Sequence, residues 1–186
     1  ISNIASVPGW SPDGQLVVFT RIDYSTGGSS ALVVADADGS HERVVATRQP
    51  PMIFIVLTII GRPSAGPVWS PDGQKIVMRS QRRAGFESDR WYLDVVDVAT
   101  GQRQTMFQTP DLSVENFTFA GDGRTILFAA QDRGVVNLYS VAYPSGTPRL
   151  ATKGGGIVGL QAGRDFAIVA RNTMTAPTDL FRVSLT

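Results

Sequence analysis

The chain of 186 residues contains no cysteine and only one histidine, His41. Without cysteine the protein has no disulfides and no thiolate that could act as a nucleophile or a ligand. A single histidine with no cysteine also disfavours a zinc site, because zinc centres draw their ligands mainly from these two residue types. The lack of cysteine fits the cytosol and the periplasm equally well, so it indicates no compartment.

An excess of one charge and a long hydrophobic run are missing too. The net charge of +1 gives no reason to expect nucleic acid or an anionic membrane surface as a partner. The longest apolar run, Met52 to Ile60, is well short of the roughly 20 residues of a membrane-spanning helix. The chain opens at Ile1 with no visible signal peptide, and a processed or truncated start would look the same. With 42% hydrophobic residues we expect one domain with a sizeable core.

A repeated turn is the most informative feature that is present. The string Trp-Ser-Pro-Asp-Gly occurs at Trp10–Gly14 and Trp69–Gly73, and a weaker copy occurs at Phe119–Gly123. Proline favours the second position of a type I turn, aspartate forms hydrogen bonds within it, and glycine adopts the left-handed conformation at its exit. An aromatic residue enters each turn and an apolar run leaves it, so each copy predicts a strand, a tight turn and another strand.

A second glycine turn follows each copy, at Gly39, Gly101 and Gly146, and no segment shows a convincing helical period. Each repeat therefore predicts four short antiparallel strands. A degenerate fourth repeat starts at Gly156, with Leu160 in the place of the tryptophan. The expected strands after the first turn are Leu16–Phe19, Leu32–Ala35 and Arg43–Ala46; then Ile76–Met78, Tyr92–Val98 and Gln104–Phe107; then Ile126–Phe128, Leu138–Val141 and Arg149–Ala151; and finally Phe166–Ala170 and Leu180–Val183.

The middle strands are apolar on both faces, which a sheet with one solvated face would not require. Radial stacking of four-stranded sheets supplies the missing cover, so the sequence predicts an all-β fold, a partial β-propeller of about four blades. A β-sandwich is the alternative, but its strands would not repeat in sets of four with the same two turns. The expected blades are residues 4–48, 66–109, 114–152 and 156–186, each a four-stranded antiparallel sheet with the last one incomplete. Because a partial ring leaves sheet faces uncovered, we expect a piece of a larger protein with more propeller on at least one side.

Two segments depart from the repeat. The hydrophobic insertion at residues 49–65 contains Met52 to Ile60, and it could form an extra buried or edge strand against the first blade, a docking surface, or a membrane-surface element. The basic cluster Arg79, Arg82 and Arg83 lies beside Gly85. We expect it to be a solvated hairpin loop rather than a nucleic-acid patch.

No catalytic constellation is visible. The chain has no Gly-x-Ser-x-Gly string, so it offers no candidate serine nucleophile ahead of an acid and a histidine in the order of an α/β-hydrolase. We expect His41 to be a solvated residue of a hairpin turn. Because Asp13, Asp72 and Asp122 recur at the same position in the first three repeats, they are expected to be turn residues rather than catalytic acids or metal ligands.

Two weaker motifs also favour structural roles. Asp36 and Asp38 resemble a fragment of a calcium loop, but the glycine follows Asp38 directly and the distal glutamate is missing. Gly154, Gly155 and Gly156 could approach a phosphate, but no helix follows them, so they are expected to be a linker between blades. The sequence therefore predicts no catalytic, cofactor-binding or metal-binding residue and no cofactor.

The turn string followed by Gln and an apolar strand resembles the propeller repeat that TolB-like proteins share with serine peptidases of the prolyl oligopeptidase family. The second half resembles the propeller of acylaminoacyl-peptidases and bacterial dipeptidyl-peptidases. The residues that carry this likeness are Asp-Leu-Ser-Val-Glu-Asn-Phe at 111–117, Ala-Gln-Asp-Arg-Gly at 130–134, Leu-Tyr-Ser-Val at 138–141, and Ala-Arg-Asn at 170–172 with a Thr/Pro-rich arm at 173–178.

The resemblance implies a parent peptidase in which a C-terminal α/β-hydrolase domain, absent from this chain, cleaves short peptides with a Ser-Asp-His triad. The propeller would then be non-catalytic, filtering peptides by size and forming one wall of the cavity. Its partners would be the missing blades and the hydrolase domain, with no nucleic acid and no membrane span. The alternative is a TolB-like or sensor propeller that acts as a protein-binding module. A third hypothesis is a free-standing small propeller that closes its ring by oligomerising.

Overall fold

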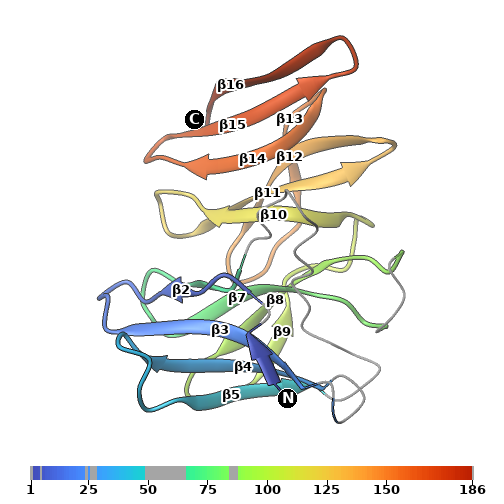
Figure 1. Ribbon diagram of the computed structural model, residues 1–186. Helices are drawn as coiled ribbons and strands as arrows, with labels where there is room; N and C mark the ends of the chain where they lie inside the picture. The colour runs from blue at the N-terminus through green and yellow to red at the C-terminus, as the bar shows by residue number, and fades with distance from the viewer. Residues whose placement is uncertain are drawn as a thin grey trace. The chain divides into compact units, whose positions relative to one another are not determined.

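The structure, a computed structural model, describes residues 2–4, 6–23, 25, 29–48, 66–83 and 88–185. These residues form β-strands, turns and loops, and none of them belongs to an α-helix, as the sequence predicted (Figure 1). Accordingly, the described part of the chain offers no helix with the length and hydropathy needed to cross a membrane. The insertion at 49–65, with its three alternatives, lies outside the described residues. The chain divides into two compact units, Ile1–Thr105 and Met106–Thr186.

The first sheet opens the first unit and has the order β1-β3-β4-β5. Two short strands lie one after the other along the same side of β3, since Ile4 is opposite Arg21 and Gly9 is opposite Val18. They therefore act as the two parts of one interrupted strand. The strands are β1 (Ser2–Ile4), β2 (Gly9–Trp10), β3 (Leu16–Asp23), β4 (Ser29–Asp36) and β5 (Arg43–Arg48).

The second sheet completes the first unit and has four antiparallel strands in sequence order, β6-β7-β8-β9. Its strands are β6 (Val68–Trp69), β7 (Lys75–Ser80), β8 (Tyr92–Asp97) and β9 (Arg103–Thr105). The last strand ends before Met106 and Phe107, so the expected segment Gln104–Phe107 was two residues too long.

The second unit forms one seven-stranded sheet. Two antiparallel groups, β10 to β13 and β14 to β16, are joined by a single parallel pair between Val136 and Gly156. Gly154 and Gly155, both at positive φ, precede this pair and turn the chain sharply toward β12. The strands are β10 (Ser113–Phe119), β11 (Thr125–Asp132), β12 (Val135–Ala142), β13 (Arg149–Thr152), β14 (Gly156–Ala162), β15 (Phe166–Thr173) and β16 (Ala176–Ser184). The Thr/Pro-rich arm is thus the tip of the β15–β16 hairpin.

The repeated turns have the predicted conformation. The amide of Gly14 donates to the carbonyl of Ser11 over 2.9 Å, and Gly14 has a φ of 70°. The equivalent bonds from Gly73 to Ser70 and from Gly123 to Ala120 measure 2.9 and 3.0 Å. These bonds close a four-residue turn with a left-handed exit, so the local signal was sufficient to place all three turns.

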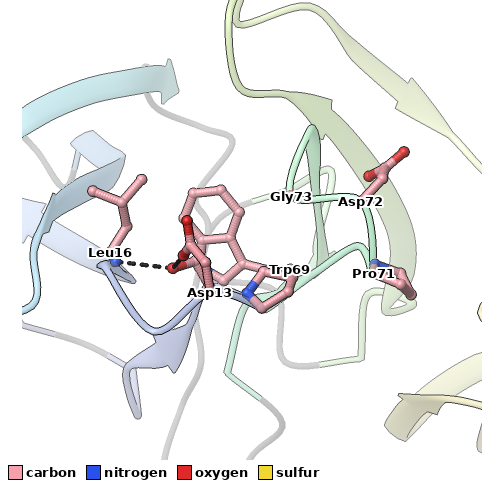
Figure 2. Close-up of a pocket in the computed structure, with 8 residues that line it drawn as sticks. Asp13, Leu16, Trp69, Pro71, Asp72 and Gly73 are labelled. Atoms are coloured by element: carbon pink, nitrogen blue, oxygen red, sulfur yellow. Dashed lines mark hydrogen bonds between the residues drawn. The ribbon is translucent and has the colours of Figure 1, made fainter.

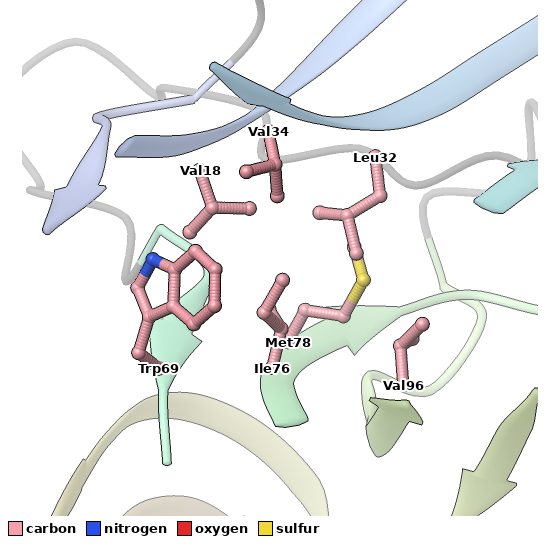
Figure 3. Packing of buried hydrophobic residues seen from close by; sticks show 7 residues of the cluster. All are labelled: Val18, Leu32, Val34, Trp69, Ile76, Met78 and Val96. Atoms are coloured by element: carbon pink, nitrogen blue, oxygen red, sulfur yellow. The ribbon is translucent and has the colours of Figure 1, made fainter. Parts of the chain in front are cut away.

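The two sheets of the first unit pack face to face through one hydrophobic cluster (Figure 3). Because side chains alternate along a strand, one face of each sheet supplies every second residue. Trp69 crosses from β6 to this interface and donates from its indole nitrogen to the carbonyl of Gly9 over 3.2 Å. The other members of the cluster are Val18, Leu32 and Val34 from the first sheet and Ile76, Met78 and Val96 from the second.

The second unit is apolar on both faces of its central strand β11. On one face, Leu127 and Ala129 join a cluster that also contains Ala167 and Val169 of β15. On the other face the ring of Phe128 stacks on Tyr139, with centroids 5.4 Å apart, and also on Phe107. This two-sided burial agrees with the pattern from which stacked sheets were predicted.

Two glycines of the first unit lie directly against backbone atoms of another segment. A Cβ atom at Gly9 would lie 2.2 Å from the carbonyl oxygen of Pro67, and one at Gly66 would lie 2.2 Å from that of Val7. Neither contact could be relieved by turning a side chain, because both obstacles are backbone atoms. The two segments can therefore approach this closely only because each of them has a glycine at the point of contact.

We expect Gly9→Ala to destabilise the protein by about 2 kcal/mol or more, since the sheets must separate to admit the methyl group. Gly39→Ala is the control, because Gly39 has open space around its Cβ position but a φ of 85°. That change should cost only about 1 kcal/mol of left-handed strain. Urea unfolding measures both, and equal losses would contradict the steric argument.

Candidate functional site

The repeated aspartates stabilise the turns that contain them. Asp13 accepts hydrogen bonds from the Ser11 hydroxyl at 2.6 Å and from the amide of Gln15 at 3.1 Å. The hydroxyl of Ser11 in turn accepts the amide of Leu16, the first residue of β3. The bond from Ser11, followed by the one from Gln15, lowers the pKa of Asp13. The carboxylate is therefore occupied in ordering the turn, as the repetition predicted.

The other two turns have the same arrangement of hydrogen bonds, with one variation. Asp72 accepts from the Ser70 hydroxyl and from the amide of Gln74. In the third turn alanine replaces the serine, and Asp122 instead accepts from both the amide and the hydroxyl of Thr125. A threonine two residues after the turn glycine thus replaces the missing serine.

The first two turns enclose a shallow pocket of about 140 Å³ (Figure 2). Figure 2 shows the indole of Trp69 lying between the two turns. Pockets that bind drug-sized ligands usually enclose about 300 to 1,000 Å³, so this one is too small for a peptide. Its lining is Ser11, Pro12, Asp13, Leu16, Trp69, Pro71, Asp72 and Gly73.

A buried ionic cluster lies at the other end of the interface between the two sheets. Its centre is Asp94 on β8, whose side chain is fully buried. Arg48, from the end of β5 in the first sheet, donates to Oδ2 of Asp94 over 3.0 Å, and it also donates to the carbonyl of Gln81. The side chain of Arg48 is only 4% exposed. This ion pair therefore joins the two sheets in a region with little water.

Two more arginines converge on the same carboxylate. Arg82 binds it in a bidentate manner, with bonds of 3.1 and 3.0 Å to Oδ2 and Oδ1. Arg103 on β9 donates to Oδ2 over 2.9 Å. The hydroxyls of Ser80 and Thr105 donate to it as well. Asp94 is thus shared by three guanidinium groups and two hydroxyls, which far exceeds what a single ion pair needs.

This role of Asp94 was not predicted from the sequence. Met78 lies opposite Asp94 in the second sheet, as Phe19 lies opposite Val33 in the first and Phe128 opposite Tyr139 in the third. All three pairs stand at the same distance from the turn glycine, so Asp94 replaces a valine or a tyrosine. Only this comparison between repeats could have singled it out.

The expectation that Arg79, Arg82 and Arg83 form a solvated loop was wrong for two of the three. Arg79 is 6% exposed and its guanidinium lies over the ring of Trp91, 4.8 Å from the centroid. Arg82 is tied to Asp94, and only Arg83 has a mostly exposed side chain. The error has a physical cause, since the acceptor Asp94 lies on a strand that the pattern marked as apolar.

His41 is exposed, as predicted, with 83% of its side chain accessible. Its Nδ1 lies 2.7 Å from Oδ2 of Asp36 and 3.1 Å from Oγ of Ser40. In a hydrolase triad the serine and the acid contact opposite nitrogens of the imidazole. Here both share one nitrogen, so the three residues order a hairpin turn and lack the geometry of a triad.

The remaining motifs from the sequence analysis also stabilise turns or connect strands. Asp38 accepts from the amide and hydroxyl of Ser40 within its own turn. Gly154 and Gly155 connect β13 to β14, and Gly156 begins β14. Among the described residues, no group of three or more histidine, cysteine, aspartate or glutamate side chains is arranged to hold a metal ion.

No protein-family model matches the chain. In sequence it is similar to dipeptidyl-peptidase 5 of Porphyromonas gingivalis, with 28% identity over 181 residues, or 94% of this chain and 25% of that protein. Dipeptidyl-peptidase 5 of Trichophyton schoenleinii is 30% identical over 79 residues, which are 42% of this chain and 11% of that protein. The chain thus spans a quarter or less of the length of these relatives.

Solved structures share the fold of this chain. TolB from Acinetobacter baumannii matches with a TM-score of 0.69 and 16% identity, over 99% of this chain and 41% of that one. Puromycin hydrolase matches with a TM-score of 0.70 and 18% identity, over 99% and 27%. The acylaminoacyl peptidase of Pyrococcus horikoshii matches with 0.57 and 12%, over 99% and 31%. The resemblance to the propeller of prolyl oligopeptidase-type peptidases, with TolB-like repeats, is therefore confirmed.

We expect Asp94→Asn to destabilise the protein by about 3 to 5 kcal/mol, because it leaves the buried Arg48 without a counter-charge. Asp165→Asn is the control, since Asp165 is 62% exposed and only 3.9 Å from Arg182. That change should alter the free energy of unfolding by less than about 0.5 kcal/mol. Equal effects in urea unfolding would show that the cluster adds nothing beyond a surface pair.

Stability should also fall in acid because of Asp97. A hydrogen bond from Lys75, followed by bonds from the amide and hydroxyl of Thr100, lowers the pKa of Asp97 to about 2. A lowered pKa in the folded state stabilises the protein above the ordinary pKa of about 4, and this contribution is lost as the pH falls toward 2. In Asp97→Asn the urea midpoint should therefore decline less between pH 4 and 2 than in the parent chain. Parallel declines would contradict this assignment.

Proposed function

We propose that this chain is the non-catalytic propeller portion of a prolyl oligopeptidase-like serine peptidase, and that it controls the access of short peptides to a hydrolase domain outside the chain. The observation that carries the proposal is the alignment of 94% of the chain with a quarter of a dipeptidyl-peptidase 5. Such a match leaves three quarters of the relative for other domains. The site geometry agrees, because the repeated aspartates and the single histidine have their hydrogen bonds within turns.

The finer architecture belongs to the same proposal. We assign residues 4–48, 66–109, 114–152 and 156–186 to four successive blades, the last of them incomplete. The two sheets of the first unit supply the first pair of blades. The single pair between Val136 and Gly156 supports a division of the third sheet into the second pair. Within each proposed blade the strands follow one another in sequence order.

The two tryptophans of the repeated turn support a further blade before the first one. Trp69 is 5% exposed and packs against the preceding sheet, where it donates to the carbonyl of Gly9. Trp10 occupies the same position in its own repeat but is 60% exposed. Because Trp69 is covered by the sheet that precedes its own, we expect Trp10 also to be covered by a sheet that precedes the first one. We therefore propose that a preceding blade in the parent protein covers Trp10.

The likeness to TolB gives a second candidate, a propeller that acts as a protein-binding module in an envelope protein or a sensor. The reading frame on both sides of the chain separates the two. A peptidase requires a Gly-x-Ser-x-Gly string followed by an aspartate and a histidine downstream of Thr186. A stop codon soon after Thr186 would overturn the peptidase proposal and favour the binding module.

Paired tryptophan substitutions test the proposed neighbour of the first blade. In the 186-residue chain, Trp69→Ala should destabilise by about 3 to 5 kcal/mol because it removes a buried aromatic side chain. Trp10→Ala should cost less than about 0.5 kcal/mol there, since its ring is mostly in water. In the full-length parent both changes should be costly. A Trp10→Ala variant of the parent that unfolds like the unmodified protein would contradict the preceding blade.

A further inference from the structure

The ionic cluster around Asp94 carries more positive than negative charge. Among the described residues, Arg48, Arg82 and Arg103 all contact this one carboxylate, so the contacts with Asp94 carry a formal surplus of two positive charges. In the part of the chain that the structure describes, the other buried carboxylate of this region is Asp89, which accepts the amide of Arg82 and pairs with the side chain of Arg83 rather than with the three arginines. A surplus of this size beside a buried ion pair is unfavourable unless water or an anion compensates it.

Of the three arginines, Arg103 is the one whose guanidinium is least satisfied by hydrogen bonds. Arg48 is buried between the two sheets. Arg82 uses both of its terminal nitrogens in four hydrogen bonds, to Asp94, Ser80 and Thr105. Within the described part of the chain, Arg103 donates one hydrogen bond, from Nη1 to Asp94, although a guanidinium has five N–H donors. Its side chain is 33% exposed, so its remaining donors can be reached from solution.

Asp94 has no capacity left to satisfy Arg103 further. Its Oδ2 already accepts from Arg48, Ser80, Arg82 and Arg103, and its Oδ1 accepts from Arg82 and Thr105. A carboxylate offers about four lone-pair positions in total. Burial also lowers the pKa of Arg103, as expected for a guanidinium that has lost water without gaining a full counter-charge.

We propose that this cluster is an oxyanion-binding site, in which Arg103 donates to a carboxylate or phosphate group and Arg82 adds a second positive charge beside it. Both arginines have a nitrogen on the same oxygen of Asp94, so their charges lie side by side. Planar guanidinium groups suit the paired oxygens of these anions. The site is independent of the proposed peptidase function, since it needs only the residues of the first unit.

Calorimetric titration of the 186-residue chain with inorganic phosphate tests the proposal, at an ionic strength held constant with sodium chloride. Binding should saturate, and Arg103→Gln should weaken it about tenfold or more, the effect of losing a charge-assisted hydrogen bond. Arg103→Lys keeps the charge but not the fork of donors, and should retain part of the affinity. Acetate that competes with phosphate would identify a carboxylate as an alternative ligand.

Arg133→Gln is the matched control, because Arg133 is 96% exposed in the second unit and the change in charge is the same. It should leave phosphate affinity unchanged. Circular dichroism and the urea midpoint establish that each variant is folded. Absence of saturable binding to the unmodified chain would overturn the proposal, as would equal affinities of the Arg103→Gln and Arg133→Gln variants.

Discussion

Burial of both faces of the central strands is the constraint on which the rest of the structure depends. In β7 the side chains of Ile76 and Met78 point into the interface with the first sheet, while Val77 is fully buried on the opposite face. A strand of this kind is stable only when something apolar covers each side of its sheet. Neither sheet of the first unit can therefore be considered alone, because each covers one face of the other.

The interface between the first two sheets changes character along its length. Near the repeated turns it is apolar, with Trp69, Val18 and Ile76 excluding water. Near the opposite end it is ionic, with Asp94 and Arg48 in contact across the sheets. The apolar part supplies most of the stabilising free energy. A buried ion pair adds little compared with an apolar pair, but it strongly penalises any neighbour that lacks the matching charge.

Local signals in the sequence were sufficient for the turns and the strands but not for the contacts between them. The positions of β3, β7 and β11 follow from a turn of five residues and the apolar run behind it, and all three were predicted. The burial of a tryptophan was not, since identical pentapeptides give Trp10 and Trp69 exposures of 60% and 5%. Exposure depends on which sheet stands opposite, which no pentapeptide encodes.

The ionic cluster was missed for the same reason. Asp94 and Arg48 are 46 residues apart, and neither belongs to a motif. The segment Tyr92–Val98 was predicted as a strand, and nothing in its sequence indicated a partner for the carboxylate of Asp94. The loop arginines were then assigned to solvent because their acceptor was unknown. Long-range electrostatic pairs of this kind become predictable only when the neighbouring sheets are already placed.

The two ends of the sheets differ in how much their turns vary. The turn between the first two strands has the same length and the same glycine in the first three repeats. At the other end the connection from β7 to β8 runs from Gln81 to Trp91, whereas β11 and β12 are joined by Arg133 and Gly134 alone. A turn that recurs unchanged serves the fold, while a connection that varies can acquire a role specific to one sheet. The arginines around Asp94 come partly from this variable end, which is where a repeat scaffold can add binding chemistry without disturbing its stacking.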